Sequence, residues 1–223
     1  MLDGSHLLCY PGLINTHHHL YQQFSRNLPE VQNLELVPWL KALYEIWKNL
    51  DTEVVHASSL TGMGELMKNG CTTCFDHHYV FPAGCGDLLG AQFAAADELG
   101  MRMVASRGSM DLSVKDGGLP PDSVVQSVDA ILEDSAALIE RWHDPSYGSM
   151  RQITLAPCSP FSVSRELLLQ SAKLARKYHV RLHTHLAETK DEERYTLDRY
   201  GLRPLAYLES LGWVGPDVWF AHG

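Results

Sequence analysis

Histidines at alternate positions are the most informative feature of this sequence. His17 and His19 follow the apolar segment Gly12–Thr16. Residues i and i+2 of a strand point to the same side, so both imidazoles would project together from the strand's C-terminal end, while His18 points elsewhere. Two convergent imidazoles are half of a zinc site, and iron and nickel accept the same ligand. We therefore predict metal binding here, rather than a His-rich surface loop or an expression-tag remnant.

A second pair of histidines closes another apolar segment. His183 and His185 end the segment Val180–His185 and share one face, and Glu188 lies in the turn that follows. A carboxylate beside a metal site can carry protons during hydrolysis. The alternative is a buried histidine pair with a helix-capping glutamate, and the presence of the first pair weakens it.

Further polar residues follow the other apolar segments. His222 ends the segment Val218–His222, and its place at the same rim favours function over the structural role that a lone histidine usually has. Asp76, His77 and His78 end the segment that begins at Cys71, where they could contact substrate or hold a loop. Arg107 and Cys158 follow two more segments, and ordinary turn chemistry is an equal alternative for them.

The cysteines do not indicate a second metal site. Cys71 and Cys74 form a C-x-x-C pattern, but no second C-x-x-C lies at zinc-finger spacing, so packing explains them better. The paired H-x-E and P-C-x-x-C motifs of the small zinc deaminases are missing. Five cysteines are also an odd number, which argues against a disulfide framework.

Short apolar segments that read as buried strands position all these side chains. They alternate with amphipathic helical patterns that start at Asp51, Pro121 and Ser164, and with shorter ones at 87–99, 191–200 and 204–211. The predicted strands are Gly12–Thr16, Cys71–Phe75, Arg102–Ser106, Gln152–Pro157, Val180–His185 and Val218–His222.

This alternation predicts an α/β fold with a parallel sheet, either an open doubly wound sheet or part of a (β/α)8 barrel. The first strand-to-helix turn has no G-x-G-x-x-G or Walker A pattern, which weakens the nucleotide-binding doubly wound alternative. A complete barrel takes roughly 250 residues, and this chain ends at Gly223, after its sixth strand. We therefore predict a TIM barrel truncated after the sixth strand.

Composition excludes several classes of function. The 223 residues carry 18 Lys plus Arg against 27 Asp plus Glu, a net charge of -9, which disfavours nucleic-acid binding. No apolar run approaches the roughly 20 residues that a membrane helix needs. The N-terminus has no basic, apolar start of the kind found in signal peptides, so we expect a cytoplasmic protein.

The motifs resemble the amidohydrolase superfamily, in the branch that deaminates nucleobases, pterins and triazines. The resemblance covers essentially the whole chain and is carried by P-G-L-I-N-T-H-x-H at 11–19, H-x-x-E at 185–188 and His222. It implies one divalent metal, zinc with iron as an alternative, bound by His17, His19 and His185. It also implies a fourth ligand, an Asp at the end of an eighth strand, which this sequence does not contain.

The resemblance also implies roles for the other residues. Glu188 would carry a proton to a ring nitrogen, His222 would hydrogen-bond the attacking water or the substrate, and Gln22 would hydrogen-bond a purine ring. Five stretches are similar to the bacterial 8-oxoguanine deaminases, at 17–22, 76–82, 107–110, 115–123 and 156–162. Three of these stretches contain His78, Arg107 and Cys158, which we expect to contact a nucleobase-like substrate.

The same resemblance implies the domain organisation. Residues 1–10 would be the remnant of a β-sandwich domain and residues 11–223 a partial TIM-barrel catalytic domain, with a homodimer in the complete protein. Alternatives of the same fold are an aminohydrolase of the hydroxyatrazine type or one acting on pterin or guanine. An alternative of another class is an inactive metal-binding fragment, since a chain without the last two strands would be weakly active or inactive.

Overall fold

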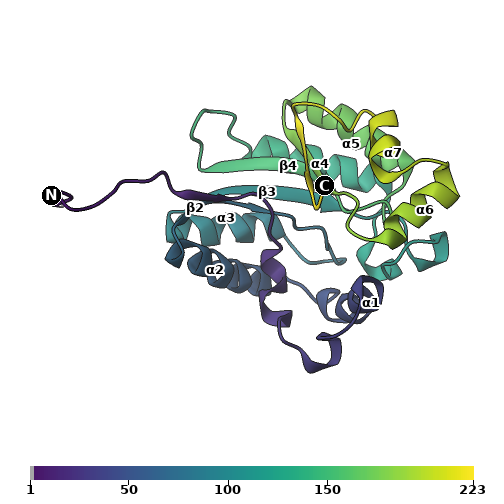
Figure 1. Cartoon of the computed structure of the whole chain (residues 1–223), viewed down its shortest axis with the longest axis horizontal. Coiled ribbons are helices and arrows are strands. Elements are labelled where there is room, and N and C mark those ends of the chain that lie inside the picture. The colour runs from purple at the N-terminus through teal and green to yellow at the C-terminus, as the bar shows by residue number, and fades with distance from the viewer. Residues whose placement is uncertain (1–2) are drawn as a thin grey trace.

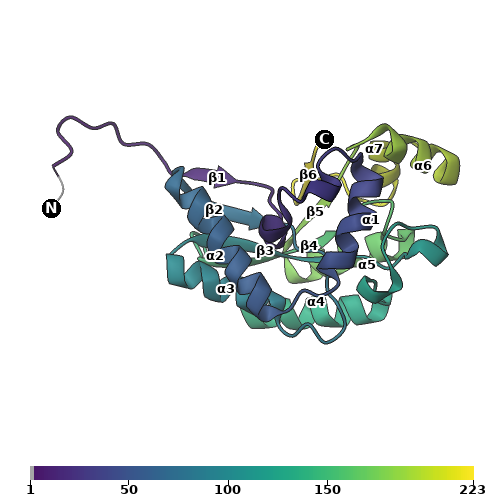
Figure 2. The same cartoon turned by 90° about the horizontal axis from the view of Figure 1, so that it is seen from below.

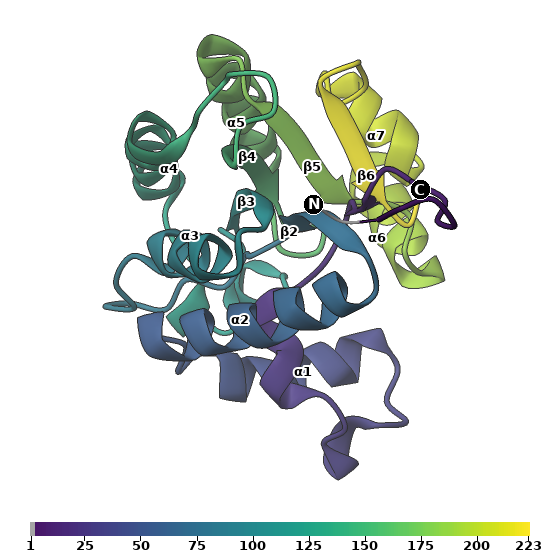
Figure 3. The same cartoon turned by 90° about the vertical axis from the view of Figure 1, so that its left-hand side faces the viewer.

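The computed structural model describes residues 3–223 as a curled sheet of six parallel strands. Each strand pairs with the next one along the chain, in the order β1-β2-β3-β4-β5-β6, and the sheet closes partly on itself (Figure 3). The strands are β1 (Leu13–Asn15), β2 (Cys71–Asp76), β3 (Arg102–Ser109), β4 (Arg151–Pro157), β5 (Arg181–His185) and β6 (Val218–Ala221). This half-barrel confirms the predicted fold class.

Helices cover the outer, convex side of the strands, as Figure 2 shows for α2 to α5. They are α2 (Thr52–Lys68), α3 (Leu88–Leu99), α4 (Val128–Trp142), α5 (Arg165–Tyr178), α6 (Lys190–Tyr200) and α7 (Pro204–Ser210). Two predicted N-caps are confirmed. The side chain of Asp51 accepts from the backbone N–H of Val54 at 2.9 Å, and that of Ser164 accepts from Leu167 at 3.1 Å.

The helix expected to start at Pro121 begins later, so that prediction was wrong. Residues Asp122–Val124 form a separate 3₁₀ turn, η4, and α4 begins only at Val128. The N-cap of α4 is Ser127, whose hydroxyl accepts from the N–H of Ala130 at 3.3 Å. Val124 belongs to this turn, and its side chain is buried in the core.

The strand-to-helix connection after β1 is longer and more structured than expected. It contains the 3₁₀ turns η1 (Leu20–Ser25) and η2 (Pro29–Val31) and the helix α1 (Leu36–Trp47), which the sequence reading missed. Another 3₁₀ turn, η3 (Val114–Asp116), follows β3. The indole N–H of Trp47 donates to the hydroxyl of Ser25 at 3.1 Å, which ties α1 to η1 beside the C-terminal ends of the strands.

The inner face of the sheet encloses a cavity of about 770 Å³, lined by side chains from all six strands. Phe75, Thr154 and Trp219 are among them. The indole N–H of Trp219 on β6 donates to the carbonyl of Thr16 at 3.1 Å, so the sheet's two edge strands approach each other at one end.

Residues 3–10 contain neither a strand nor a helix, and they run away from the sheet as an extended tail (Figure 1). The assignment of residues 1–10 to a β-sandwich domain stays a prediction, and residues 1 and 2 lie outside the described part of the chain. Among the described helices, none combines the length and the hydropathy that a membrane span requires.

Candidate metal centre

The C-terminal ends of three strands bring four histidines together. His17 and His19 follow β1, His77 follows β2 and His185 ends β5. Each offers one ring nitrogen, and these four nitrogens lie within 4.8 Å of one another. The structure therefore places the three predicted ligands side by side, and it adds His77, which we had not predicted as a ligand.

Backbone carbonyls orient two of these rings. Nδ1 of His19 lies 2.7 Å from the carbonyl oxygen of His77, and Nδ1 of His185 lies 2.8 Å from that of Cys158. A carbonyl oxygen only accepts, so both Nδ1 atoms carry the proton of the neutral ring and both Nε2 atoms present a lone pair. Carbonyl partners of this kind commonly orient metal-binding histidines.

The two lone pairs face each other, because Nε2 of His19 lies 3.2 Å from Nε2 of His185. Neither nitrogen has a proton to share, so this contact is not a hydrogen bond, and two lone pairs at this distance repel. A cation about 2.0–2.1 Å from each nitrogen fits this separation and removes the repulsion. The donor set thus fits a divalent metal that prefers imidazole.

His17 is oriented by a second imidazole. Nδ1 of His183 lies 2.9 Å from the carbonyl oxygen of Trp219, so it must donate, and the neutral ring then has a bare Nε2. Nδ1 of His17 lies 2.9 Å from that Nε2 and donates to it, which leaves Nε2 of His17 free as a ligand. His183 thus holds the tautomer of His17 from the far side of the ring.

Burial keeps these imidazoles neutral at pH 7. Desolvation, helped by neighbouring imidazoles, lowers the pKa of His17 to about 4, that of His183 to about 2 and that of His185 to about 3. The pKa values of His19 and His77 are also lowered well below the usual range, again chiefly by burial. A neutral imidazole is the form that binds metal.

Glu188 stands in a tightly held turn between β5 and α6. The buried carboxylate of Glu192 accepts from the backbone N–H groups of Ala187 at 2.9 Å and of Glu188 at 3.0 Å. Ala187 has a left-handed backbone (φ 55°), which a non-glycine residue adopts only when its surroundings enforce it. Burial raises the pKa of Glu188, and nearby His222 partly offsets this effect.

His222 lies beside Glu188, with its Nε2 3.8 Å from the carboxylate oxygen Oε1. Its backbone is also left-handed (φ 66°), which turns the chain at the end of β6. Its ring centroid is 5.5 Å from that of His185 and 5.8 Å from that of His17. The structure thus brings the two predicted catalytic residues together beside the histidine cluster.

A cavity of about 730 Å³ opens at this rim, and both Gln22 and Glu188 line it. Gln22 comes from η1, while Trp39 of α1 and Val31 of η2 supply apolar lining. This volume falls within the range of roughly 300–1,000 Å³ typical of small-molecule sites. The larger cavity inside the sheet contains no Glu188 and none of the four clustered histidines.

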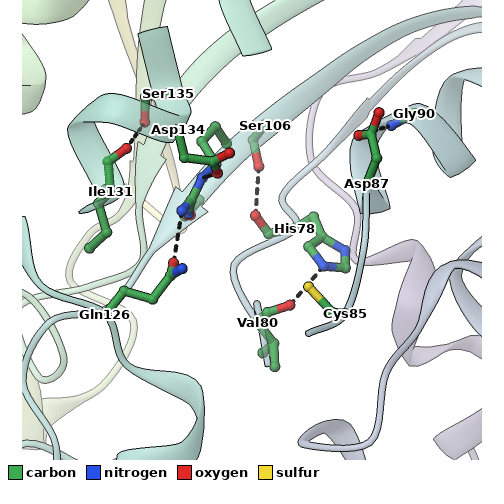
Figure 4. A network of polar contacts seen from close by, with 12 residues as sticks. His78, Val80, Cys85, Asp87, Gly90, Ser106, Gln126, Ile131, Asp134 and Ser135 are labelled. Atoms are coloured by element: carbon green, nitrogen blue, oxygen red, sulfur yellow. Dashed lines mark hydrogen bonds and ion pairs between the residues drawn. The ribbon is translucent and has the colours of Figure 1, made fainter. Parts of the chain in front are cut away.

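The other expected substrate contacts are engaged within the protein. His78 is buried, and its Nε2 donates to the carbonyl of Val80 at 2.9 Å, while its own carbonyl accepts from the hydroxyl of Ser106 at 3.2 Å (Figure 4). The same carbonyl accepts from the N–H of Gly108, where a Cβ would lie 2.2 Å from that oxygen, so only glycine fits.

Arg107 and Cys158 are also buried. The guanidinium of Arg107 donates to Asp134 at 2.6 Å and to Gln126 at 2.7 Å, and it lies 4.0 Å from the centre of the Phe81 ring. The thiol of Cys158 lies 4.0 Å from Nδ1 of His185, and burial raises its pKa to about 12. For Arg107, Cys158 and His78, substrate contact stays a prediction.

The chain is similar in sequence to known proteins. The chain is 50% identical over 221 residues to the 8-oxoguanine deaminase of Pseudomonas aeruginosa, covering 99% of this chain and 49% of that protein. It is 42% identical over 220 residues to the hydroxydechloroatrazine ethylaminohydrolase of Pseudomonas sp. strain ADP, covering 97% of this chain and 45% of that protein. The chain thus spans about half the length of these curated relatives.

Solved structures agree with the sequence relatives. The crystal structure of an atrazine chlorohydrolase from Arthrobacter aurescens TC1, complexed with zinc, matches with a TM-score of 0.90 at 33% identity. The match covers 95% of this chain and 48% of that one. The model of the amidohydrolase family matches residues 8–223. This chain belongs to the amidohydrolase family.

Proposed function

We propose that the complete polypeptide containing this chain is a metal-dependent aminohydrolase of a purine-like ring, which converts 8-oxoguanine and water to urate and ammonia. The observation that carries the proposal is the pair of facing Nε2 lone pairs of His19 and His185, 3.2 Å apart, at a rim shared with Glu188. The choice of substrate is supported by the 50% identity to an 8-oxoguanine deaminase over nearly the whole chain.

His17, His19 and His185 would hold one divalent metal, zinc or alternatively iron. The related chlorohydrolase was crystallised with zinc, and imidazole nitrogens suit both metals. A metal bound here supplies hydroxide from water at neutral pH. Backbone carbonyls and His183 keep the ligand tautomers fixed, so the binding nitrogens are set before the metal arrives.

Glu188 and His222 would handle the protons of the reaction. Because burial raises the pKa of Glu188, its carboxyl holds a proton more readily near neutral pH. It can give this proton to the ring nitrogen beside the carbon that carries the amine, and then help the amine leave as ammonia. His222, whose Nε2 lies 3.8 Å from Oε1 of Glu188, would orient the attacking water. Gln22 would hydrogen-bond the ring in the shared cavity.

The test is ammonia release by the complete polypeptide, loaded with zinc, from 8-oxoguanine, guanine, isoxanthopterin and hydroxyatrazine. We expect the highest kcat/KM with 8-oxoguanine. No ammonia from any of the four compounds contradicts the proposal.

A second candidate is the hydrolytic removal of an amine or a halide from a triazine ring. It is favoured by the 42% identity to a triazine aminohydrolase and by the structural match to a chlorohydrolase. Turnover of hydroxyatrazine or atrazine without turnover of 8-oxoguanine supports this candidate over the first. The assay separates the two candidates because the residues that line the pocket around Gln22, and not the metal ligands, select which ring is bound.

A further inference from the structure

His77 has a buried ring nitrogen that bonds to nothing in the described part of the protein. Its side chain is fully buried, and its Nε2 lies 3.0 Å from the carbonyl oxygen of Ala156. That oxygen only accepts, so Nε2 carries the proton and Nδ1 presents a lone pair. Nδ1 has no hydrogen-bond partner among the described residues. A buried polar atom without a partner is uncommon and needs a physical explanation.

The neighbours of this nitrogen are themselves lone-pair donors. The ring of His77 lies 4.6 Å from that of His185, 5.5 Å from that of His19 and 5.7 Å from that of His17. The free nitrogens of these rings carry no proton, for the reasons given above, so none of them can donate to His77. Each of the four rings offers one nitrogen within 4.8 Å of those of the other three, a spacing at which one metal ion can accept electron pairs from all of them.

Burial alone does not produce this arrangement, as the next residue shows. His78 is equally buried, and its Nδ1 is also without a partner. Its ring, however, packs against Tyr21 and Phe81 at centroid distances of 4.8 and 4.9 Å, and it is not part of the four-histidine cluster. Among residues 3–223, only His77 combines an unpartnered ring nitrogen with membership of the cluster that contains the three predicted ligands.

We propose that Nδ1 of His77 is an additional ligand of the metal that His17, His19 and His185 bind. The inference rests on the metal site of the proposed function and adds a ligand from β2, a strand that the sequence motifs had not connected with the metal. Because Nε2 of His77 is anchored on Ala156, the ring needs no new hydrogen bond to present Nδ1. A site with four imidazoles favours zinc, iron or nickel over magnesium or calcium.

The most direct test is a crystal structure of the complete polypeptide loaded with zinc, with the metal located by anomalous scattering. We expect His77 Nδ1 at about 2.0–2.1 Å from the metal. A metal on His17, His19 and His185 with His77 Nδ1 beyond about 3 Å, too far for a zinc–nitrogen bond, overturns this inference and leaves the proposed function standing. No metal at any of the four residues overturns both.

Two matched variants give an independent readout that does not depend on activity. In His77→Gln we expect zinc affinity, measured by competition with a chromophoric chelator, to fall by about tenfold or more. Even the loss of an outer partner of a ligand costs roughly 10–100-fold. We also expect the visible spectrum of the cobalt-loaded protein to change. His78→Gln should keep both the affinity and the spectrum, and wild-type values for His77→Gln overturn the inference.

Discussion

At the scale of single residues, backbone carbonyls determine which ring nitrogen of each histidine carries the proton and which is free to bind a metal. The carbonyls of His77, Cys158 and Trp219 each accept a hydrogen bond from an imidazole Nδ1, which leaves Nε2 as the unprotonated nitrogen of that ring. His77 and Cys158 directly follow strands β2 and β4 and Trp219 lies within β6, so the positions of these carbonyls depend on the sheet and not on side-chain rotamers. The nitrogens that we propose as metal ligands are thus oriented by the backbone of the sheet.

Glu188→Gln tests the proton carrier at nearly constant size. We expect kcat for ammonia release to fall by about 10²–10⁴-fold, because glutamine cannot deliver the proton, while zinc content stays at the wild-type value. Steady-state kinetics and metal analysis measure the two quantities. Glu166→Gln, on the exposed surface of α5, is the matched control and should change neither. Full kcat in Glu188→Gln would show that another group carries the proton.

The buried imidazoles predict that the metal-free protein is sensitive to acid. The pKa of His78 and that of His185 are about 3 in the folded state, against about 6.5 in an unfolded chain. Between these values the unfolded state binds more protons, so the free energy of unfolding falls as pH drops below about 6.5. Asp76, with its pKa raised to about 7, acts in the opposite direction.

More imidazoles than carboxyls contribute to this pH dependence of the free energy of unfolding. Among the described residues, burial lowers the pKa of eight histidines and raises that of four carboxyls. We therefore expect the urea midpoint of the chelated protein to decrease from pH 7 to pH 5. A midpoint that stays constant or rises over this interval would contradict the neutral, buried state of the cluster.

At the scale of elements, the strands and the i, i+2 histidine pairs were predictable because both depend on local alternation. All six strands lie where the apolar segments placed them. The sequence analysis did not predict the helix α1, although Leu40, Leu43, Tyr44 and Trp47 have helical spacing. The start of α4 was placed too early because Pro121 and Asp122 are residue types typical of a helix start, whereas here they begin a separate 3₁₀ turn.

His77 marks the limit of what the sequence could show about the site. The motif D-H-H at the end of β2 identified a polar strand end, but not which of its side chains would reach the other histidines. That depends on the curl of the sheet, which brings β2 and β5 to face each other across the barrel, and on the carbonyl of Ala156 in β4. The approach of side chains from opposite strands depends on tertiary structure and could not be predicted from the local sequence pattern.

A substitution of Glu192 tests whether the turn between β5 and α6 positions Glu188. Its carboxylate holds the turn that carries Glu188, so Glu192→Gln replaces an acceptor with an NH₂ group facing a backbone N–H. We expect the free energy of unfolding to fall by about 1–3 kcal/mol, and kcat to fall with KM nearly unchanged. Chemical denaturation and steady-state kinetics measure these changes.

The control for this variant is the next residue on α6. Glu193 forms a partly exposed ion pair with Arg203, a type of contact worth about 0–1 kcal/mol. Glu193→Gln should therefore leave kcat unchanged and affect stability little. If Glu192→Gln and Glu193→Gln change kcat and the free energy of unfolding by the same small amounts, Glu192 does not position Glu188.

At the scale of the whole molecule, the half-barrel has two sheet edges and an open interior. β1 forms one edge, with Leu13 and Ile14 63% and 66% exposed, and a cavity of about 770 Å³ lies inside the sheet. Exposed apolar strands of this kind promote association. The relatives are about twice as long as this chain, which leaves room for further strands in the complete polypeptide.

Residues 1–223 alone should therefore differ from the complete polypeptide in three measurable ways. We expect a lower thermal midpoint, stronger binding of a hydrophobic dye and little or no ammonia release, because the inner face of the sheet stays uncovered. Calorimetry, dye fluorescence and the ammonia assay check these differences. Equal turnover by both proteins would show that the six strands contain the whole active site.

The proposed deamination depends on one metal bound by histidines from separate strands. Its most direct test is to remove metal from the complete polypeptide with a chelator, and to follow ammonia release from 8-oxoguanine while zinc is added back. We predict no turnover without metal and a linear rise that stops at one zinc per chain. Two results would contradict this dependence: turnover by the metal-free protein, or no recovery of ammonia release at any ratio of zinc to protein.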